Sequence, residues 1–423
     1  MDLVTTALGD DQAGRRPAAG GSGRRLRVLL HDFGGYGFIA ELARELARRG
    51  HWVHHVHYAS LRSGKGALAR RDGDPETLTF TGLTVAAGFD RYRPLDRLRL
   101  ERRYARALAA SADQWQPDVV LASNTPLLIL HWLRPRLDRA GIPLVNWLQD
   151  LHSLAMGEDL VRRAGPAGRP AGWLLERVES RLLRRNAAVI AITGDFLPTL
   201  RRWRVAQERV TVIHNWAELA PAGGRHNPFS AEHGLDGRVT LLYAGTLGLK
   251  HEPHQLIALA EAFRDRPDVA VVVVTEGIGR QRLEEEKRAR GLPNLLLVDF
   301  QPPERVPDVL ATGDVLLSMV RPEAGRFSVP SKVLTYLAAG RAQLCAIPPE
   351  NLAARVVAES GGGVVVAAGR ADELVAAARR LVDDEGLRAA LGRQGRAYAE
   401  ANFDLALAAD RIEAVLTRSA RAR

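Results

Sequence analysis

Short runs of apolar residues recur along the chain, and stretches with the period of an amphipathic helix separate them. In the first half, the runs expected to form strands are Leu26–Leu30, Trp52–Tyr58, Val119–Ala122, Leu144–Leu148 and Ala188–Ile192. In the second half they are Val239–Tyr243, Ala270–Thr275, Leu295–Leu297, Val315–Ser318, Ala342–Ala346 and Gly363–Val366. None shows the strict alternation of a half-solvated antiparallel strand, and continuous apolar runs are typical of parallel strands buried on both faces. The pattern predicts two doubly wound, Rossmann-like α/β domains.

The length of 423 residues also favours two domains, because a single hydrophobic core seldom grows that large. We expect a disordered leader at the start, because residues 1–23 are rich in Ala, Gly and Asp and lack the apolar core of a signal peptide. A loss of periodicity near residues 216–236 indicates the domain boundary. The expected parts are a leader (1–23), an N-terminal domain (24–217), a linker (218–235), a C-terminal domain (236–399) and a tail (400–423) whose helix Leu405–Arg418 crosses back to the first domain.

The net charge of +10 lies entirely in the first half. Residues 1–220 carry 33 Lys and Arg against 23 Asp and Glu, whereas residues 221–423 carry 26 of each. The asymmetry indicates an anionic partner for the first half, either a membrane surface, a phosphorylated acceptor or nucleic acid. Nucleic acid is the weakest of the three, because no helix-turn-helix, zinc-finger or RNA-binding signature is present. Arginine-rich codon usage explains the same excess without any partner.

Two basic, partly amphipathic stretches stand out in this half, Leu95–Leu108 and Trp173–Arg185. The second sets Trp173, Leu174, Val178 and Leu182 against Arg177, Arg181, Arg184 and Arg185. Either stretch could lie on anionic lipid, or pack on a sheet with a solvated arginine face. No run of about 18 apolar residues suggests a membrane span, so we expect a cytoplasmic protein associated peripherally with the inner face of the cell membrane.

The most informative segment is the loop, helix and strand over residues 326–348. Ser331 is expected to be the N-cap of a helix over Lys332–Ala339 that Gly340 ends. Free backbone N–H groups at that helix start, with a hydroxyl and an ammonium beside them, suit a phosphate or diphosphate. A plain surface helix of an α/β domain would have the same local pattern. The lone cysteine, Cys345, excludes an internal disulfide, and no metal cluster or cofactor is indicated.

A family resemblance rests on segments that come in one order. They are Gly34–Gly37 (GGYG) with a helix ending at Arg49–His51, Val145–Leu151 (VNWLQDL), Val212–Trp216 (VIHNW), Tyr243–Lys250 (YAGTLGLK), Thr275–Arg280 (TEGIGR), Asn294–Phe300 (NLLLVDF), Asp314–Val315 and Val329–Gly340 (VPSKVLTYLAAG). This set resembles the GT-B-fold glycosyltransferases of family 4, especially the bacterial O-antigen and capsule branch that includes fucosaminyltransferases. The resemblance covers residues 26–403 and implies two Rossmann-like domains that face a cleft.

For the second domain the resemblance implies a nucleotide-sugar donor site. Cations and helix starts there would stabilise the negative charge that grows on the leaving diphosphate, without a metal. The implied residues are Lys250 and Lys332 for the diphosphate, with Gly245, Thr246, Gly277, Gly279, Arg280, Phe300, Glu323, Ser331 and Thr335 around the donor. Thr246 stands where the family usually has Arg, and Phe327 and Thr335 stand where it usually has two glutamates. Thr335 could still reach a ribose, and Glu323 is either a substitute or a surface acid.

For the first domain the expected site combines a glycine turn and the end of a strand. Gly34, Gly35 and Gly37 allow a phosphate or acceptor to approach the backbone, although a plain βα turn has the same glycines. Asp150 follows the strand Leu144–Leu148 at the carboxyl edge, where such sheets keep ligands. Asp150 or His152 would activate or orient an acceptor hydroxyl, or Asp150 simply caps the next turn.

Together these features predict a retaining glycosyltransferase for surface-polysaccharide synthesis. Its donor would be a UDP-linked hexose or N-acetylhexosamine, and its acceptor a lipid-linked saccharide. A nucleotide-sugar epimerase of the same fold and a non-catalytic partner subunit remain as alternatives. A dinucleotide-dependent oxidoreductase is disfavoured, because no Gly-x-Gly-x-x-Gly sequence opens the first βαβ unit.

Overall fold

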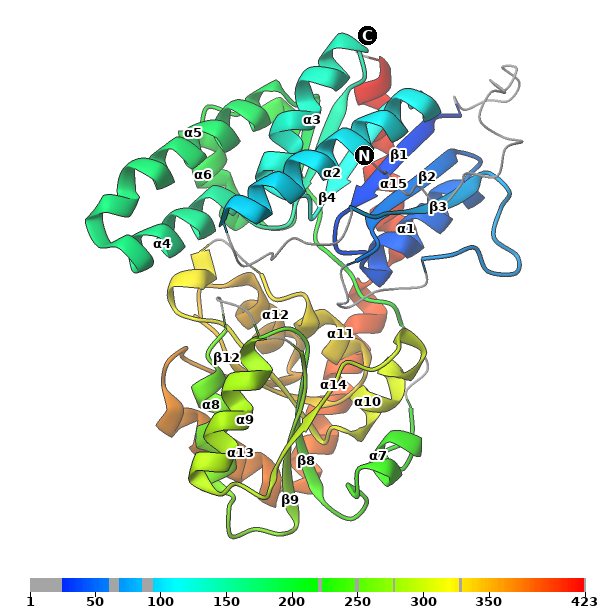
Figure 1. Cartoon of the computed structure of the whole chain (residues 1–423). Coiled ribbons are helices and arrows are strands. Elements are labelled where there is room, and N and C mark those ends of the chain that lie inside the picture. Colours follow the sequence, from blue (N-terminus) through cyan, green and yellow to red (C-terminus); the bar gives the residue numbers. More distant parts are fainter. Residues whose placement is uncertain are drawn as a thin grey trace. The chain divides into compact units, whose positions relative to one another are not determined.

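The computed structural model describes residues 25–60, 68–85, 94–219, 223–247, 251–276, 278–326 and 329–421. By their internal contacts they form two compact units (Figure 1). The first unit runs to His214 and also contains Leu405–Arg423, and the second runs from Asn215 to Asp404. The final helix thus packs within the first unit. Among the described residues, no helix is long and apolar enough to cross a bilayer.

The first unit is built on a seven-stranded, wholly parallel sheet in the order β3-β2-β1-β4-β5-β6-β7. The strands are β1 (Arg27–Asp32), β2 (Trp52–Tyr58), β3 (Leu78–Leu83), β4 (Val119–Ser123), β5 (Leu144–Leu148), β6 (Ala188–Ala191) and β7 (Val210–Val212). The order reverses between β1 and β4, which is where doubly wound sheets place their ligands. The apolar runs predicted five of these strands; β3 and β7 were missed because they are short or alternate with polar residues at the edges of the sheet.

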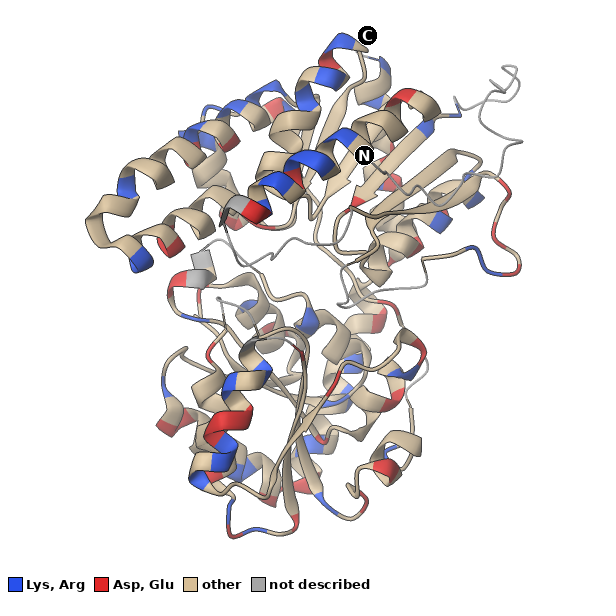
Figure 2. Cartoon of the chain, in the orientation of Figure 1, with Lys and Arg blue, Asp and Glu red and all other residues tan. Residues whose placement is uncertain are grey.

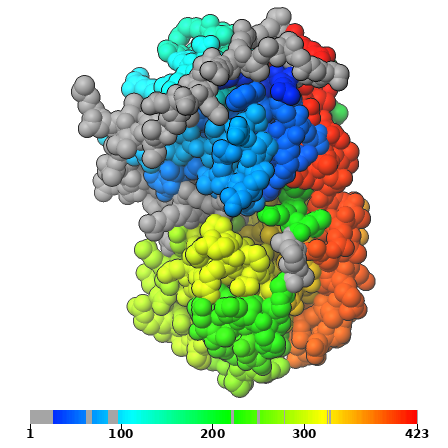
Figure 3. Space-filling model, turned by 90° about the vertical axis from the view of Figure 1, so that its right-hand side faces the viewer, coloured from blue at the N-terminus to red at the C-terminus, as the bar shows by residue number. Residues whose placement is uncertain are grey.

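Helices cover both faces of this sheet (Figure 1). They are α1 (Gly37–Arg48), α2 (Pro94–Trp115), α3 (Leu127–Arg139), α4 (His152–Ala164), α5 (Arg169–Arg185), α6 (Leu197–Arg202) and α15 (Leu405–Arg421). The apolar faces of α2, α3 and the end of α5 build one core around Tyr104, Leu108 and Leu133. On the other face α15 packs against α1 and three central strands, and Figure 3 shows its red surface beside the blue surface of the N-terminal elements.

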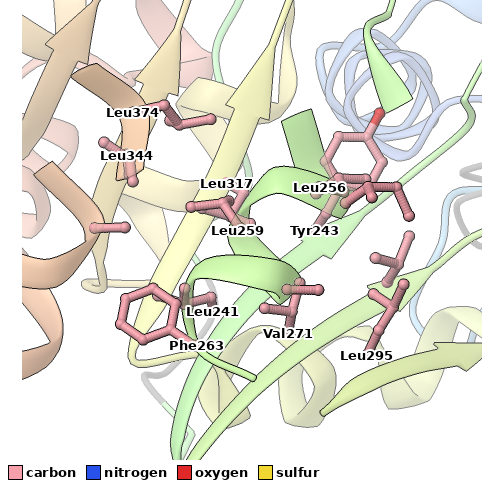
Figure 4. Close-up of a cluster of buried hydrophobic side chains, with 14 of the residues drawn as sticks. Leu241, Tyr243, Leu256, Leu259, Phe263, Val271, Leu295, Leu317, Leu344 and Leu374 are labelled. Atoms are coloured by element: carbon pink, nitrogen blue, oxygen red, sulfur yellow. The ribbon is translucent and has the colours of Figure 1, made fainter. Parts of the chain in front are cut away.

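The second unit contains a six-stranded parallel sheet in the order β10-β9-β8-β11-β12-β13. The strands are β8 (Val239–Ala244), β9 (Val269–Val274), β10 (Leu295–Val298), β11 (Val315–Met319), β12 (Ala342–Ala346) and β13 (Gly363–Val366). The helices are α7 (Pro228–Glu232), α8 (Pro253–Ala262), α9 (Ile278–Arg290), α10 (Val306–Thr312), α11 (Lys332–Ala338), α12 (Leu352–Ser360), α13 (Ala371–Asp383) and α14 (Glu385–Asn402). A core of Leu, Val and Phe side chains joins α8 and α13 to one face of the sheet, as Figure 4 shows.

The segment 218–235, expected to be a linker, is partly folded into the second unit. Asn227 caps α7 with a capping box, and Phe229 and Leu235 are fully buried in the core beneath α10 and α11. Arg225 adds an ion pair with Asp314, its Nε lying 3.0 and 3.1 Å from the two carboxylate oxygens. Residues 225–235 of the segment predicted to be a linker therefore include a helix, because the Pro, Gly and His content that suggested a linker also suits a capped single-turn helix.

Candidate functional site

The loop after β8 meets the start of α11 in the second unit. The Tyr336 hydroxyl donates to the carbonyl oxygen of Ala244 and accepts from its N–H, both at 3.1 Å. The Tyr243 hydroxyl donates to the carbonyl oxygen of Thr246 at 2.9 Å. These bonds fix the β8 loop against α11, so residues 88 positions apart in the sequence, Ala244 and Lys332, belong to one site.

Lys332 is the central cation of this site. Its Nζ lies 3.6 Å from the centroid of the Tyr243 ring and is shielded from solvent. Gly245 is essential to that placement, because a Cβ there would come within 2.9 Å of Nζ and the residue has φ +139°. A desolvated cation–π contact of this kind contributes on the order of 2 kcal/mol. The structure therefore brings Lys332, Gly245 and Thr246 together as the sequence suggested.

The start of α11 differs from the expectation at Ser331. Ser331 has helical dihedral angles, φ −61° and ψ −22°, and its side chain makes no capping hydrogen bond. The helix is Lys332–Ala338, one residue shorter than expected, and Gly340 follows with φ +67°. The Ser331 and Thr335 side chains are both on exposed residues, so their hydroxyls are open to a ligand. The expected side-chain N-cap was wrong because Pro330 already directs the chain into the helix, its carbonyl oxygen accepting from Val333 N–H.

Other predicted donor residues have structural partners of their own. A Cβ on Gly279 would come within 2.4 Å of Leu247 Cβ, so this glycine lets the first turn of α9 pack on the β8 loop. Arg280 pairs with Asp299 at 3.1 Å, and Phe300 packs at the edge of the core beneath α10. Gly279 therefore has a packing role in the fold, and Arg280 has an ion-pair partner within it.

The remaining donor predictions are less well supported by geometry. Glu323 lies in a short 3-10 helix, Glu323–Arg326, and is exposed. Lys250 and Gly277 lie outside the described residues, as does Phe327.

In the first unit, the glycine turn folds around a buried carboxylate that ends β1. Asp32 accepts hydrogen bonds from the backbone N–H of Gly34 at 3.1 Å and of Tyr36 at 2.5 Å. Gly35 has φ +70°, and Gly37 begins α1. Burial raises the pKa of Asp32 to about 7, although these hydrogen bonds oppose the shift. Two of the turn's amides, those of Gly34 and Tyr36, thus already bind a carboxylate. A role of Gly34, Gly35 and Gly37 in binding a phosphate or an acceptor stays a prediction.

Asp150 and His152 lie at the same carboxyl edge, after β5. Asp150 is half-buried and close enough to Tyr36 to help raise the pKa of that phenol, whose shift is due mainly to burial. His152 is the first residue of α4, and its side chain is 30% exposed. Asp32 is in register with Ser123 at the end of β4, and Gln149 lies 3.4 Å from the Ser123 hydroxyl. The ends of β1, β4 and β5 therefore present one cluster of polar side chains.

Glu179 on α5 is a residue of this site that the sequence did not reveal. Its buried carboxylate accepts from the backbone N–H of His152 at 3.1 Å and of Ser153 at 2.8 Å. It also lies 3.9 Å from His152 Nδ1, and burial raises its pKa. Glu179 thus caps α4 and positions His152, but no local pattern links residues 27 positions apart. Asp32 was also missed, although its place between an apolar run and a glycine turn is a readable signal.

Chemically, the second unit can hold an anion against Lys332 and the open hydroxyls of Ser331 and Thr335. The first unit can hold hydroxyl groups against the carboxylates and amides at its sheet edge. In the described ranges, no group of three or more His, Cys, Asp or Glu side chains could hold a metal ion.

Comparisons with known proteins agree with this division. The family profile "Glycosyl transferase 4-like domain" matches residues 34–216, and "Glycosyl transferases group 1" matches residues 227–398. The putative colanic acid biosynthesis glycosyl transferase WcaI of Escherichia coli (strain K12) is 27% identical over 232 residues, or 54% of this chain and 56% of that protein. The alpha-D-kanosaminyltransferase of Streptomyces kanamyceticus is 26% identical over 246 residues, or 56% of this chain and 62% of that protein.

Solved structures support the fold. Anabaena HepE in complex with UDP-glucose superposes with a TM-score of 0.67 at 18% identity, covering 93% of this chain and 100% of that one. The two curated relatives are matched over little more than half of their lengths, so they do not by themselves establish an activity. The two profiles, which between them span nearly all of both units, and the shared fold show that this chain belongs to the family 4 glycosyltransferases of the GT-B type.

Proposed function

We propose that this protein is a glycosyltransferase that moves a hexose or N-acetylhexosamine from a UDP-linked donor to a lipid-linked saccharide during surface-polysaccharide synthesis. The observation that carries the proposal is the solvent-shielded ammonium of Lys332, held over Tyr243 and against Gly245 beside the start of α11. Support for a UDP-linked donor comes from HepE, whose structure holds UDP-glucose. Support for a polysaccharide product comes from WcaI, whose name assigns it to colanic acid biosynthesis.

In this proposal the second unit binds the donor. As the sugar–phosphate bond breaks, negative charge grows on the β-phosphate, and a fixed cation in a low-dielectric site stabilises that charge without reorganisation. Lys332 supplies the cation, Ser331 donates a hydroxyl to the diphosphate, and Thr335 contacts the ribose in place of a family glutamate. No metal or other cofactor is required.

The first unit binds the acceptor at the ends of β1, β4 and β5. Asp150 orients the acceptor hydroxyl, and His152, held by Glu179, is the second candidate for that role. Transfer proceeds with retention, so the leaving phosphate itself can accept the proton and no strong base is needed. The protein works at the inner face of the cell membrane, where its acceptor resides.

Lys332→Ala provides the direct test. Loss of one preorganised charge-stabilising group lowers kcat by about 100-fold or more, and loss of the cation–π contact with Tyr243 lowers the free energy of unfolding by about 2 kcal/mol. Lys287→Ala on α9, outside the site, is the matched control. Assays would follow sugar transfer from UDP-sugars to lipid-linked acceptors. Full activity of Lys332→Ala would contradict the assignment.

The alternatives make different predictions for the same enzyme preparation. An epimerase would convert the UDP-sugar in the absence of any acceptor, which product analysis would reveal. The absence of the family's two glutamates, at Phe327 and Thr335, favours a non-catalytic partner subunit to some degree. Such a subunit would neither turn over UDP-sugars nor bind a nucleotide.

A further inference from the structure

Helices α4 and α5 form a hairpin whose outer end is not covered by the first unit. A 3-10 turn, Gly165–Gly168, joins them, and Figure 1 shows the pair extending beyond the edge of the sheet. The inner ends are buried, at Ser153 on α4 and at Leu182 and Leu183 on α5. Most residues over 161–174 are exposed, so this part of the hairpin, here called the hairpin end, contributes little to the core.

The hairpin end carries unusual apolar exposure. Trp173 is 59% exposed, Leu174 58% and Val161 36%. Only six large apolar side chains are exposed across the described residues, and three of them lie here. Isolated exposed apolar residues need no explanation, but three of them at the end of one helical hairpin indicate an interaction surface.

The fold does not need these side chains for its own packing. A Cβ on Gly172 would come within 3.0 Å of Gly157 Cα, and a Cβ on Gly168 within 2.5 Å of the Leu160 carbonyl oxygen. The two backbones therefore touch through glycines, while the side chains of Trp173, Leu174 and Val161 stay exposed. Because the two helices pack closely at these glycines, Trp173, Leu174 and Val161 are not needed between them and remain available to a partner outside the protein.

Basic residues exceed acidic ones by one around this surface, since residues 158–177 contain Arg162, Arg163, Arg169 and Arg177 against Glu158, Asp159 and Glu176. Arg177 lies over the Trp173 ring, 4.7 Å from its centroid. Asp159 pairs with Arg162 and Arg163, and Glu176 pairs with Arg202. Figure 2 shows the basic residues in blue and the acidic ones in red along the helices of the first unit.

Tryptophan beside arginine, with leucine and valine, is the combination that binds the interface of an anionic bilayer. The indole sits at headgroup depth, aliphatic side chains enter the acyl boundary, and arginines bind lipid phosphates. We propose that the hairpin end docks this protein on anionic phospholipid, inserting Trp173, Leu174 and Val161 while Arg162, Arg163 and Arg169 contact the headgroups.

This proposal is narrower than the expectation drawn from the basic stretches. Val178 and Leu182 face inward against the core, while Arg184 donates to the carbonyl oxygen of Trp203 and Arg185 pairs with Asp138. The inner half of α5 therefore packs as an ordinary surface helix. The docking surface needs neither donor nor acceptor, so it is tested apart from sugar transfer.

Vesicle flotation of the full-length protein gives the first readout. We expect binding to vesicles of phosphatidylcholine with phosphatidylglycerol, weak binding to phosphatidylcholine alone, and partial release by salt. Trp173→Ser with Leu174→Ser should weaken binding by about tenfold or more, because the inserted apolar area is lost. Leu407→Ser on α15 is the matched control, since Leu407 is also 58% exposed, and it should bind like the wild type.

Depth of insertion gives the second readout. Lipids brominated on the acyl chains should quench part of the wild-type tryptophan emission, and Trp173→Phe should lose that part while still binding vesicles. Unchanged binding by the double variant would overturn the proposal. The proposal would also be overturned if vesicle binding were lost in the α2 variant Arg102→Gln/Arg106→Gln but kept in Trp173→Ser/Leu174→Ser. Self-association that the double variant abolishes, without vesicle binding, would assign the surface to a second copy of the chain and equally overturn it.

Discussion

Gly245 shows how much of the donor site depends on a single backbone position. Its φ of +139° is open to glycine alone in practice, and its missing Cβ leaves the space beside Lys332 Nζ. Gly245 thus allows the backbone conformation of the loop after β8 and leaves room for the Lys332 ammonium over the Tyr243 ring. A side chain added here would press directly on the ammonium of Lys332.

Gly245→Ala should therefore displace Lys332 and reduce kcat/KM for the donor by about tenfold or more, equivalent to about 1.4 kcal/mol of lost transition-state stabilisation. Backbone strain should lower the free energy of unfolding by about 1–3 kcal/mol. Gly234→Ala is the control, because Gly234 also has a positive φ, +61°, but no atom within 4 Å of its would-be Cβ. Steady-state kinetics would check the effect. Equal losses in both variants would mean that strain, and not displacement of the ammonium, is responsible.

At the scale of elements, β1 and β2 bring a set of histidines into the interior of the first unit. His31, His54 and His55 are fully buried on these adjacent strands. Burial lowers the pKa of His31 to about 3 and of His54 to about 4, and that of His55 well below its usual value. His55 has no hydrogen-bond partner among the described residues. The folded protein therefore keeps these imidazoles neutral.

The sign of the resulting pH dependence follows from linkage. Below pH 6.5 the unfolded chain binds protons that the folded chain does not, so the free energy of unfolding falls as pH drops from 6.5 towards 4. Each such histidine contributes a slope of up to about 1.4 kcal/mol per pH unit. Urea unfolding at several pH values should give a shallower slope for His55→Leu than for the wild type. Val53→Ala, at a fully buried position of β2 that does not titrate, should leave the slope unchanged, and equal slopes in all three proteins would contradict the account.

The terminal helix α15 is a second element whose role is structural. Arg49 donates to Glu413 at 3.0 Å and to the carbonyl oxygen of Ala406 at 2.9 Å, which joins α15 to the end of α1. On α15 itself, the Ile412 side chain is fully buried, whereas Leu407 is largely exposed. The chain thus returns to the first unit after it has completed the second.

Ile412→Ala should lower the free energy of unfolding of the first unit by about 2–5 kcal/mol, because it leaves a cavity in a close-packed core. Leu407→Ala on the same helix should change it by less than about 0.5 kcal/mol. Chemical denaturation followed by circular dichroism would measure both. A small effect of Ile412→Ala would show that α15 contributes little to the stability of the first unit.

At the scale of the whole molecule, the charge is divided between the two units. The excess of basic residues lies in residues 1–220, while the half that contains Lys332 is neutral in sum. A neutral donor-binding unit must therefore rely on a local cation rather than on a general field to hold a diphosphate. This makes nucleotide binding specific to the site and testable on the intact protein.

UDP should raise the thermal unfolding temperature of the full-length protein more than GDP, ADP or NAD does. A ligand at 100 times its dissociation constant stabilises by about 2.7 kcal/mol, which gives a measurable shift. The shift should be much smaller in Lys332→Ala and unchanged in Lys287→Ala. A response to GDP alone would change the donor assignment, and no response to any nucleotide would favour the non-catalytic alternative.

Much of the architecture was predictable from local pattern. Apolar runs identified eleven strands of the two sheets, because a parallel strand buried on both faces has almost no polar residues. Ordered motifs around Lys332 and Gly245 likewise indicated the donor site, since a helix start and a glycine turn are encoded within a few residues. The sequence analysis did not identify α7, although its capping box of Asn227 and Ser230 is local, and it expected a cap from the Ser331 side chain that the structure does not show.

By itself, then, the sequence determined the fold class and the family, and it predicted Lys332 as the cation of the proposed donor site. Only the tertiary structure decided that Asp32 occupies the glycine turn's amides, that Glu179 holds the start of α4, and that Trp173 and Leu174 face outward while Val178 faces inward. The physical reason is that periodicity and turn chemistry act between near neighbours in the chain. The partner of a buried carboxylate, or the cover over an apolar side chain, is set by which distant elements pack together.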